Sequence, residues 1–203
     1  MTSPRPFAPV DRAWFEAPVL ALARRLIGAV VVHERDGAVA AGRIVETEAY
    51  RGPQDLAAHS AGGRRTARTE AMFGPPGCAY MFLLYGTSWA LNVTAGPIGD
   101  PHAVLVRALE PVAGLEEMAA RRGMPPTRRE LTNGPGKLCK ALGLDRSHYG
   151  LPLWQRPLFI AEGRRGLIGR SSRINIDYAG SWIDKPWRFY ERGNRWVSVP
   201  PRH

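Results

Sequence analysis

Residues 43–50, Arg-Ile-Val-Glu-Thr-Glu-Ala-Tyr, constrain the fold more than any other stretch of this sequence. Their β-branched residues favour an extended backbone, and strict alternation puts Glu46, Glu48 and Tyr50 on one face of the strand. Ile44 is expected on that same face. Two carboxylates on a buried face carry a large desolvation cost unless each has a partner. The stretch therefore indicates either a site that uses an acid chemically or a strand end whose acids pair with surface arginines.

The charge balance indicates a polyanionic partner. The chain has 203 residues, with 28 basic against 18 acidic side chains, which gives a formal net charge of +10. Only three of the basic residues are lysines, and the planar guanidinium of arginine suits bidentate contact with phosphate. An arginine-rich proteome would explain the ratio of arginine to lysine, but it would not explain the net excess.

Other features of the sequence argue against several classes of protein. Cys78 and Cys139 are the only cysteines, and the five histidines lack metal-ligand spacing, so we expect no disulfide framework, metal or cofactor. No run of about 18 apolar residues is present, and residues 1–9 contain no apolar signal-peptide segment. We expect a cytoplasmic protein with no membrane partner, associated with the nucleoid if the source is bacterial.

The order of the predicted elements indicates one α+β domain at residues 13–203, preceded by a flexible N-terminal arm at residues 1–12. We expect helices at 17–27, 114–122 and 135–142, and strands at 29–33, 41–48, 80–85, 89–94, 103–109, 158–161, 173–176 and 196–199. Asp36-Gly37 predicts a tight hairpin turn. The strands should form a mostly antiparallel curved sheet with several surrounding helices and a protruding hairpin that ends at Tyr85-Gly86.

Several polar residues lie where a site could form. His59 follows the acidic strand closely, and an acid, a ring and an imidazole so near in sequence could meet in one small pocket. Arg107 lies within an apolar run and needs an anionic partner, for which Glu46 and Glu48 are the candidates. Asn92 also has apolar neighbours, which indicates a hydrogen-bonded core residue or part of a pocket wall.

Basic residues in two loops could contact phosphate. Arg64, Arg65 and Arg68 lie in a loop rich in glycine and threonine, where they could grip a phosphate backbone or be ordinary exposed arginines. Asn133 is a possible cap for the helix that begins near Pro135. The free amides of that helix start, with Lys137 beside them, could bind an anion or could simply belong to a well-capped helix.

Seven blocks of the sequence, taken together and in this order, resemble the 3-methyladenine DNA glycosylases of the alkyladenine (methylpurine) type. The blocks are residues 42–50, 57–64, 72–77, 80–86, 106–111, 133–139 and 185–198. The resemblance implies a monofunctional DNA glycosylase that flips alkylated or deaminated purines out of duplex DNA and hydrolyses their N-glycosidic bond, which starts base excision repair. The substrates of this class are 3-methyladenine, 7-methylguanine, hypoxanthine and ethenoadenine. The implied partner is double-stranded DNA that contains damaged purines, and the protein is expected to be a monomer.

The resemblance also implies roles for individual residues. Glu48 would be the general base that activates water, and Arg107 would help to hold that water. Tyr50, His59 and Phe82 would stack on the flipped base, although the family more usually has tyrosine at position 82. Asn92 would exclude the exocyclic amino group of guanine. Tyr85 would fill the gap that the flipped base leaves in the duplex. The residues that would contact DNA are Arg64, Arg65 and Lys137.

Chemical reasoning from the residues agrees with these roles. Glu46 is the rival base, but Glu48 lies nearer the loop that should open a cavity, and Glu46 is expected to pair with an interior arginine. Neutral lesions would also need protonation of the leaving base, for which His59 or another donor could serve. A lyase step would require a Schiff-base lysine, and the acidic segment contains none, so we expect base removal without strand nicking.

Two other functions are compatible with parts of the sequence. A non-catalytic nucleic-acid-binding protein could have the same basic surface, but it would not depend on Glu48. A nucleoside hydrolase that acts on free nucleosides would need neither the net charge of +10 nor a wedge residue. Its activity should also depend little on salt, whereas binding through several phosphates weakens steeply with salt.

Overall fold

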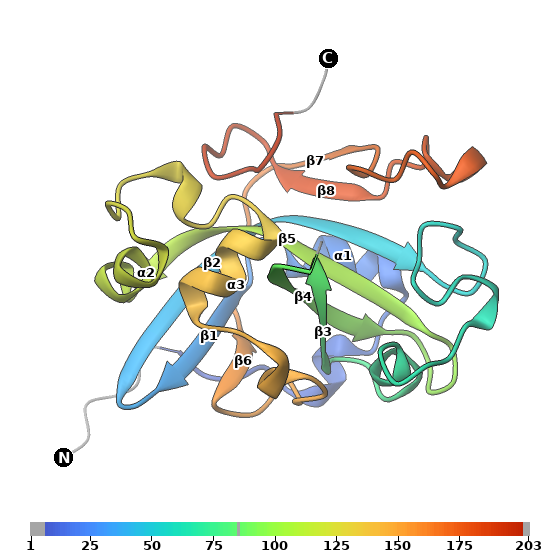
Figure 1. Cartoon of the computed structure of the whole chain (residues 1–203), viewed down its shortest axis with the longest axis horizontal. Helices are drawn as coiled ribbons and strands as arrows, with labels where there is room; N and C mark the ends of the chain where they lie inside the picture. Colours follow the sequence, from blue (N-terminus) through green and yellow to red (C-terminus); the bar gives the residue numbers. More distant parts are fainter. Residues whose placement is uncertain (1–6, 85, 201–203) are drawn as a thin grey trace.

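The structure, a computed structural model, describes residues 7–84 and 86–200. These residues form an eight-stranded antiparallel sheet, three α-helices and several short 3₁₀ turns, which confirms the expected α+β class. The main path through the sheet runs β3-β4-β5-β2-β1-β6, and β8 pairs with both β2 and β7. Figure 1 shows α3 in front of the sheet and the β7–β8 pair along the top of the view.

The strands and helices have the following bounds. The strands are β1 (Val30–Arg35), β2 (Ala38–Arg51), β3 (Ala79–Leu84), β4 (Ser88–Ala95), β5 (His102–Ala113), β6 (Leu158–Ala161), β7 (Ile168–Ser171) and β8 (Arg188–Glu191). The helices are α1 (Val19–Leu26), α2 (Leu115–Arg122) and α3 (Pro135–Leu142). Asp36 and Gly37 both have positive φ, 51° and 80°, as expected for the tight turn that joins β1 to β2.

One main core holds the elements together. Apolar side chains of α1 and α3 pack with those of β2, β4 and β5 in a single cluster, which includes Leu22, Leu26, Leu91, Leu109, Leu138 and Leu142. Burial of each such side chain stabilises the fold by roughly 1.5–3 kcal/mol. The core lies beneath the long central strands β2 and β5, and these strands carry the acidic and basic residues of the predicted site.

Two β-bulges interrupt the pairing of β2 with β5 beside the acidic residues. The register passes from Ile44 opposite Leu109 to Glu46 opposite Ala108, which leaves Val45 as the extra residue of β2. The strict alternation expected from the sequence is therefore wrong at this point. Ile44 packs in the main core, while Val45 packs in a separate cluster with Ala108. In the next step Thr47 lies opposite Val106, so Arg107 is the extra residue of β5.

Two of the expected strands are wrong. Residues 173–176 form a bend rather than a strand, with Asn175 at a φ of 57°, because the Ile174 amide donates to the side chain of Glu48 instead of to a neighbouring strand. Residues 196–199 lie in turns, and the Ser198 amide donates to Glu46. The C-terminal strands are instead β7 and β8. In both cases a backbone amide donates its hydrogen bond to a buried carboxylate and not to a neighbouring strand.

The N-cap expected for α3 is also wrong. Gly134 occupies that position and no side chain caps the helix, because the side-chain oxygen of Asn133 accepts a hydrogen bond from Nζ of Lys137 at 2.9 Å. Near the N-terminus, Pro9 forms a β-bridge with Ala161, and Val10 is buried.

None of the helices in residues 7–84 and 86–200 has the length and apolar character of a membrane span.

Candidate active site

A cavity of about 580 Å³ opens between the β3–β4 hairpin, the start of α3 and the bend at residues 174–178. It brings together six of the residues proposed from the sequence. These are Tyr50, His59, Phe82, Asn92, Arg107 and Lys137. Arg64 and Arg65 do not line the cavity. Tyr85, the expected wedge, lies outside the described residues.

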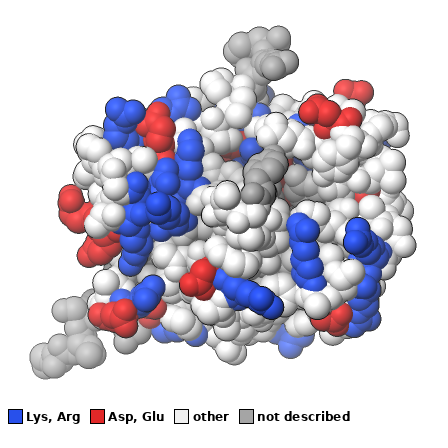
Figure 2. Space-filling model, in the orientation of Figure 1, with Lys and Arg blue, Asp and Glu red and all other residues white. Residues whose placement is uncertain are grey.

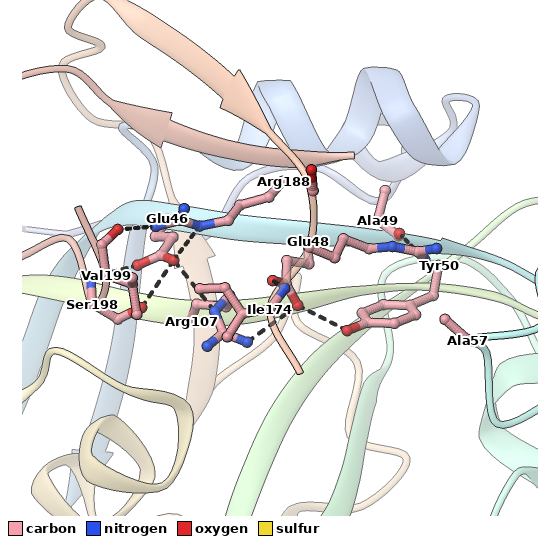
Figure 3. Close-up of polar contacts among 12 residues, drawn as sticks. Glu46, Glu48, Ala49, Tyr50, Ala57, Arg107, Ile174, Arg188, Ser198 and Val199 are labelled. Carbon is pink, nitrogen blue, oxygen red and sulfur yellow. Dashed lines mark hydrogen bonds and ion pairs between the residues drawn. The ribbon is translucent and has the colours of Figure 1, made fainter. Parts of the chain in front are cut away.

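Glu48 lies directly behind the wall of this cavity. Its side chain has no exposed surface, and each of its three hydrogen-bond donors belongs to a residue that lines the cavity. The Ile174 amide donates to Oε1 at 2.7 Å, while the Tyr50 hydroxyl and Nη1 of Arg107 donate to Oε2 at 2.8 and 3.1 Å. Figure 3 shows these donors around the carboxylate. A carboxylate offers about four lone-pair sites, so one site remains, on Oε1.

Tyr50 is a hydrogen-bond donor at neutral pH. Burial, and then the neighbouring Glu48 carboxylate, raise the pKa of Tyr50 well above its ordinary value. The phenol therefore keeps its proton and donates it to Oε2 of Glu48. This contact fixes the Tyr50 ring in the cavity wall and ties the carboxylate to it.

Glu46 accepts four hydrogen bonds, three on Oε1 and one on Oε2. Its buried carboxylate accepts hydrogen bonds from Nε of Arg188 at 2.7 Å and from Nε of Arg107 at 3.3 Å. It also accepts from the amide and the hydroxyl of Ser198, at 2.6 and 2.9 Å. Glu46 therefore pairs with interior arginines, which confirms that expectation, and no residue of the Glu46 cluster other than Arg107 lines the cavity.

Arg107 joins the two acids. Its guanidinium contacts both Glu46 and Glu48, so both candidate partners expected from the sequence are confirmed. Burial alone would lower the pKa of Arg107, but the Glu48 and Glu46 carboxylates raise it above its ordinary value. The site therefore contains a permanent positive charge between two buried carboxylates.

The opposite wall of the cavity is aromatic. The rings of His59 and Phe82 meet edge to face with their centroids 4.5 Å apart, and Nδ1 of His59 lies 2.8 Å from the hydroxyl of Tyr80. Nη2 of Arg68 lies 3.1 Å from Nε2 of His59. Because arginine only donates, Nε2 accepts this bond, and the proton of the neutral ring therefore lies on Nδ1 and is donated to Tyr80.

His59 is neutral at physiological pH. Burial, followed by the charges of Arg68 and Arg64, lowers the pKa of His59 to about 4. A neutral imidazole that donates its one proton to Tyr80 is not a source of protons for a bound molecule. The ring is therefore better suited to stacking than to acid catalysis.

The pKa of His59 predicts a specific acid sensitivity. Between pH 6.5 and about pH 4 the unfolded chain binds a proton at this residue that the folded chain does not bind, so the free energy of unfolding falls as the pH falls. At pH 4.5 this contributes roughly 2–3 kcal/mol. We expect wild type to lose that much more stability than His59→Asn between pH 7 and pH 4.5, measured by urea unfolding. Parallel pH dependence of the two proteins would contradict the assignment.

Basic side chains surround the cavity and spread over this face of the molecule. Figure 2 shows Lys and Arg gathered on the side where α2 lies, with further groups toward the lower right. Arg68, Arg122, Lys137 and Lys140 line the cavity itself. Arg64 is exposed. Arg65 forms an ion pair with Glu70 at 2.6 Å and covers the ring of Phe73.

Sequence reasoning missed several residues of the site. Tyr80 alternates with Phe82 along β3, so the pattern contained a signal for its place in the wall. Arg68 was not missed, because it belongs to the arginine cluster that the sequence predicts as a phosphate contact, and of that cluster it is the residue that lines the cavity. No local pattern marks the Ile174 amide, because it reaches Glu48 from 126 residues away. Residues 7–84 and 86–200 contain no group of three His, Cys, Asp or Glu side chains arranged to hold a metal ion.

Comparisons with known proteins agree with one another. A family model described as methylpurine-DNA glycosylase matches residues 13–195. A protein of Bacillus cereus (strain ATCC 10987 / NRS 248) is 46% identical over 198 residues, which cover 92% of this chain and 97% of that protein. A protein of Bacillus cytotoxicus is 46% identical over 210 residues, which cover 98% of this chain and all of that protein. Both carry the name "Putative 3-methyladenine DNA glycosylase".

Proposed function

Because the chain belongs to the methylpurine-DNA glycosylase family, we propose that it flips alkylated or deaminated purines out of duplex DNA and cleaves their N-glycosidic bond with a water activated by Glu48. The family makes it a DNA glycosylase of base excision repair, with DNA as its substrate. The lesions, the flipping step and the role of Glu48 are our proposal.

One observation supports the proposal above the others. A buried carboxylate with one lone-pair site to spare lies behind an aromatic cavity of about 580 Å³, a volume in the range of pockets that bind small ligands. The donors to that carboxylate are themselves parts of the cavity wall. A purine that enters this cavity would bring its sugar close to the acid, which is the arrangement that the reaction requires.

The proposed reaction balances without a cofactor. Oε1 of Glu48 accepts a proton from water, and the water oxygen forms a bond to C1′ of the sugar. The bond between C1′ and N9 of the purine breaks, and its electron pair leaves with the base. A purine methylated at N3 already carries a positive charge, so it departs as a neutral molecule. The products are a free base and an abasic site.

The selection of damaged purines over normal ones would then depend on the aromatic wall and on Asn92. The faces of Tyr50 and Phe82 attract a cationic base by roughly 0.5–2 kcal/mol per contact, which favours alkylated purines only modestly. Asn92 is buried, and its amide donates to the Tyr80 carbonyl at 3.1 Å. This contact fixes the amide, and the proposed role of Asn92 is to exclude the amino group of guanine. For neutral lesions such as hypoxanthine, the proton must come from a donor other than His59.

We infer that the enzyme has no lyase activity. Two lysines, Lys137 and Lys140, line the cavity, but Nζ of Lys137 donates to Asn133 at 2.9 Å. A Schiff base requires an amine that can attack C1′, whereas the proposed base, Glu48, lies behind the part of the wall that Tyr50 and Ile174 form. The absence of nicking before alkali treatment would support this inference.

DNA binding is assigned to the basic residues around the cavity. Arg64, Arg68 and Lys137 would contact phosphates, and Arg65 would do so only after giving up its ion pair with Glu70. Tyr85 remains the proposed wedge, because it follows Leu84 of the cavity wall in the chain. Action as a monomer is also part of the proposal.

The function is tested with duplexes that each contain one lesion. We expect 3-methyladenine or 7-methylguanine, hypoxanthine and ethenoadenine duplexes to yield abasic sites, detected as strand breaks only after hot alkali. Binding should weaken steeply with salt, since each phosphate contact releases counterions. The matching free nucleosides should remain intact. Release of base from nucleosides, or binding without any base release, would support the two rival functions instead.

A further inference from the structure

We propose that the buried ion pair of Asp55 and Arg173 is a positioning element for Glu48. The pair holds the Ile174 amide and the Tyr50 ring in the places from which both donate to this carboxylate. The inference rests on the proposed function, because it assigns the pair a role in the reaction of Glu48. Neither Asp55 nor Arg173 lines the cavity.

Asp55 fixes the loop that leads from β2 to His59. Its carboxylate accepts hydrogen bonds from the amides of Arg51 and Ala57 at 3.1 and 3.0 Å. Both of its oxygens also accept from the Arg173 guanidinium, at 2.5 and 2.9 Å. The two side chains are fully buried. This bidentate contact joins a loop of the cavity wall to a segment that lies 118 residues further along the chain.

Arg173 is held by aromatic and polar contacts of its guanidinium, although its buried Nε has no hydrogen-bond partner. The guanidinium carbon lies 4.8 Å from the centroid of the Tyr50 ring and 5.2 Å from that of the Trp187 ring, and Nη1 donates to the Ala49 carbonyl at 3.0 Å. An arginine with a bidentate partner, two stacked rings and a backbone acceptor has little freedom to move. It therefore fixes both the plane of the Tyr50 ring and the backbone from which its own side chain extends.

The Ile174 amide depends on this anchor. It is separated from the Arg173 Cα by one planar peptide unit, and it donates to Oε1 of Glu48 at 2.7 Å. Residues 172–176 belong to no strand, so no ladder holds them in place. Figure 3 shows Ile174 and Tyr50 reaching Glu48 from different sides. The Arg173 anchor is common to both contacts, which is why we assign it a positioning role.

The test compares Asp55→Asn with a matched variant, Glu110→Gln. Both changes remove a carboxylate charge from an ion pair with arginine, but the partner of Glu110 is Arg43, at the far end of the β2–β5 pairing. We expect Asp55→Asn to slow single-turnover excision by roughly 10- to 100-fold, with affinity for the lesion duplex within about threefold of wild type. Glu110→Gln should leave the excision rate unchanged.

A second readout does not depend on activity. In wild type the Ile174 amide should exchange slowly with deuterium, as measured by nuclear magnetic resonance, because it is bonded to a buried carboxylate. Exchange should become at least about tenfold faster in Asp55→Asn and remain slow in Glu110→Gln. If Asp55→Asn does not fold, the excision rate and the exchange of the Ile174 amide are measured in Arg173→Lys instead. Lysine keeps the charge but loses the bidentate and stacked contacts.

The possible results separate this inference from the proposed function. Folded Asp55→Asn or Arg173→Lys with wild-type excision and a protected Ile174 amide would overturn the positioning role and leave the glycosylase intact. A wild-type protein that excises no lesion would overturn the proposed function. In that case the exchange of the Ile174 amide still decides whether the ion pair positions it.

Discussion

Glu48→Gln should lower the single-turnover rate of base excision by about 10²–10⁴-fold, the range expected for loss of a general base. Glutamine has nearly the same size, so it fills the buried space and its oxygen can still accept from the Ile174 amide. It cannot take a proton from water. In the variant, the glutamine NH₂ group takes the place of Oε2, which accepts hydrogen bonds from Tyr50 and Arg107 in wild type. Affinity for a lesion-containing duplex, measured by fluorescence anisotropy, should remain within about tenfold of wild type.

Glu46→Gln is the matched control for this change. Position 46 lies two residues away on the same strand and has an equally buried carboxylate, but of its contacts only Arg107 lines the cavity. We expect this variant to lose stability, because four hydrogen bonds converge on Glu46, while it keeps most of the excision rate. A folded Glu46→Gln protein as inactive as Glu48→Gln would show that the base has been assigned to the wrong carboxylate.

Arg107→Met should be the most destabilising single change in the site. It removes the guanidinium that contacts both Glu46 and Glu48, and breaking a buried ion pair by removing one partner typically costs about 3–5 kcal/mol. For a protein of this length the melting temperature should fall by roughly 6–20 °C. Urea unfolding measures the loss, and excision should fall with it because Glu48 loses one of its donors.

Two further proteins show whether the loss comes from unpaired charge. Arg128→Met removes an arginine from an exposed ion pair with Glu130, which should cost no more than about 1 kcal/mol. The double variant Arg107→Met/Glu48→Gln should recover part of the stability, since one of the uncompensated charges is then absent. Equal costs for Arg107→Met and Arg128→Met would contradict the buried network.

Sequence patterns predicted the central part of the fold well. The Asp36-Gly37 turn, the strand before it and the long apolar runs of β4 and β5 have clear local signals, and all lie where expected. The partners of Arg107 were also predictable, because a buried guanidinium needs an anion and the neighbouring strand contains two. Tyr50, His59 and Phe82 line one cavity and Glu48 lies behind its wall. Each of these residues lies at or near an element with a strong pattern.

Long-range contacts explain what could not be predicted. Residues 173–176 and 196–199 have strand-forming composition, but Ile174 and Ser198 give their amides to buried carboxylates on β2. The local sequence does not show whether a backbone amide will donate to a distant carboxylate or to a neighbouring strand. The bulge at Val45 has no marker either, because a valine suits both faces of a strand. The resemblance to a known family, rather than periodicity, supplied the role of Asn92 in excluding guanine.

The two bulges also restrict how this enzyme can change in length. Val45 is extra on β2 and Arg107 is extra on β5, and the two cancel, so that Arg43 lies opposite Glu110 before them and Tyr50 lies opposite Ala103 beyond them in one continuous register. Deleting Val45 alone would shift one half of the β2–β5 pairing by a residue and turn its side chains to the other face. Deleting Arg107 as well would restore the register, but it would remove the guanidinium that the two acids share.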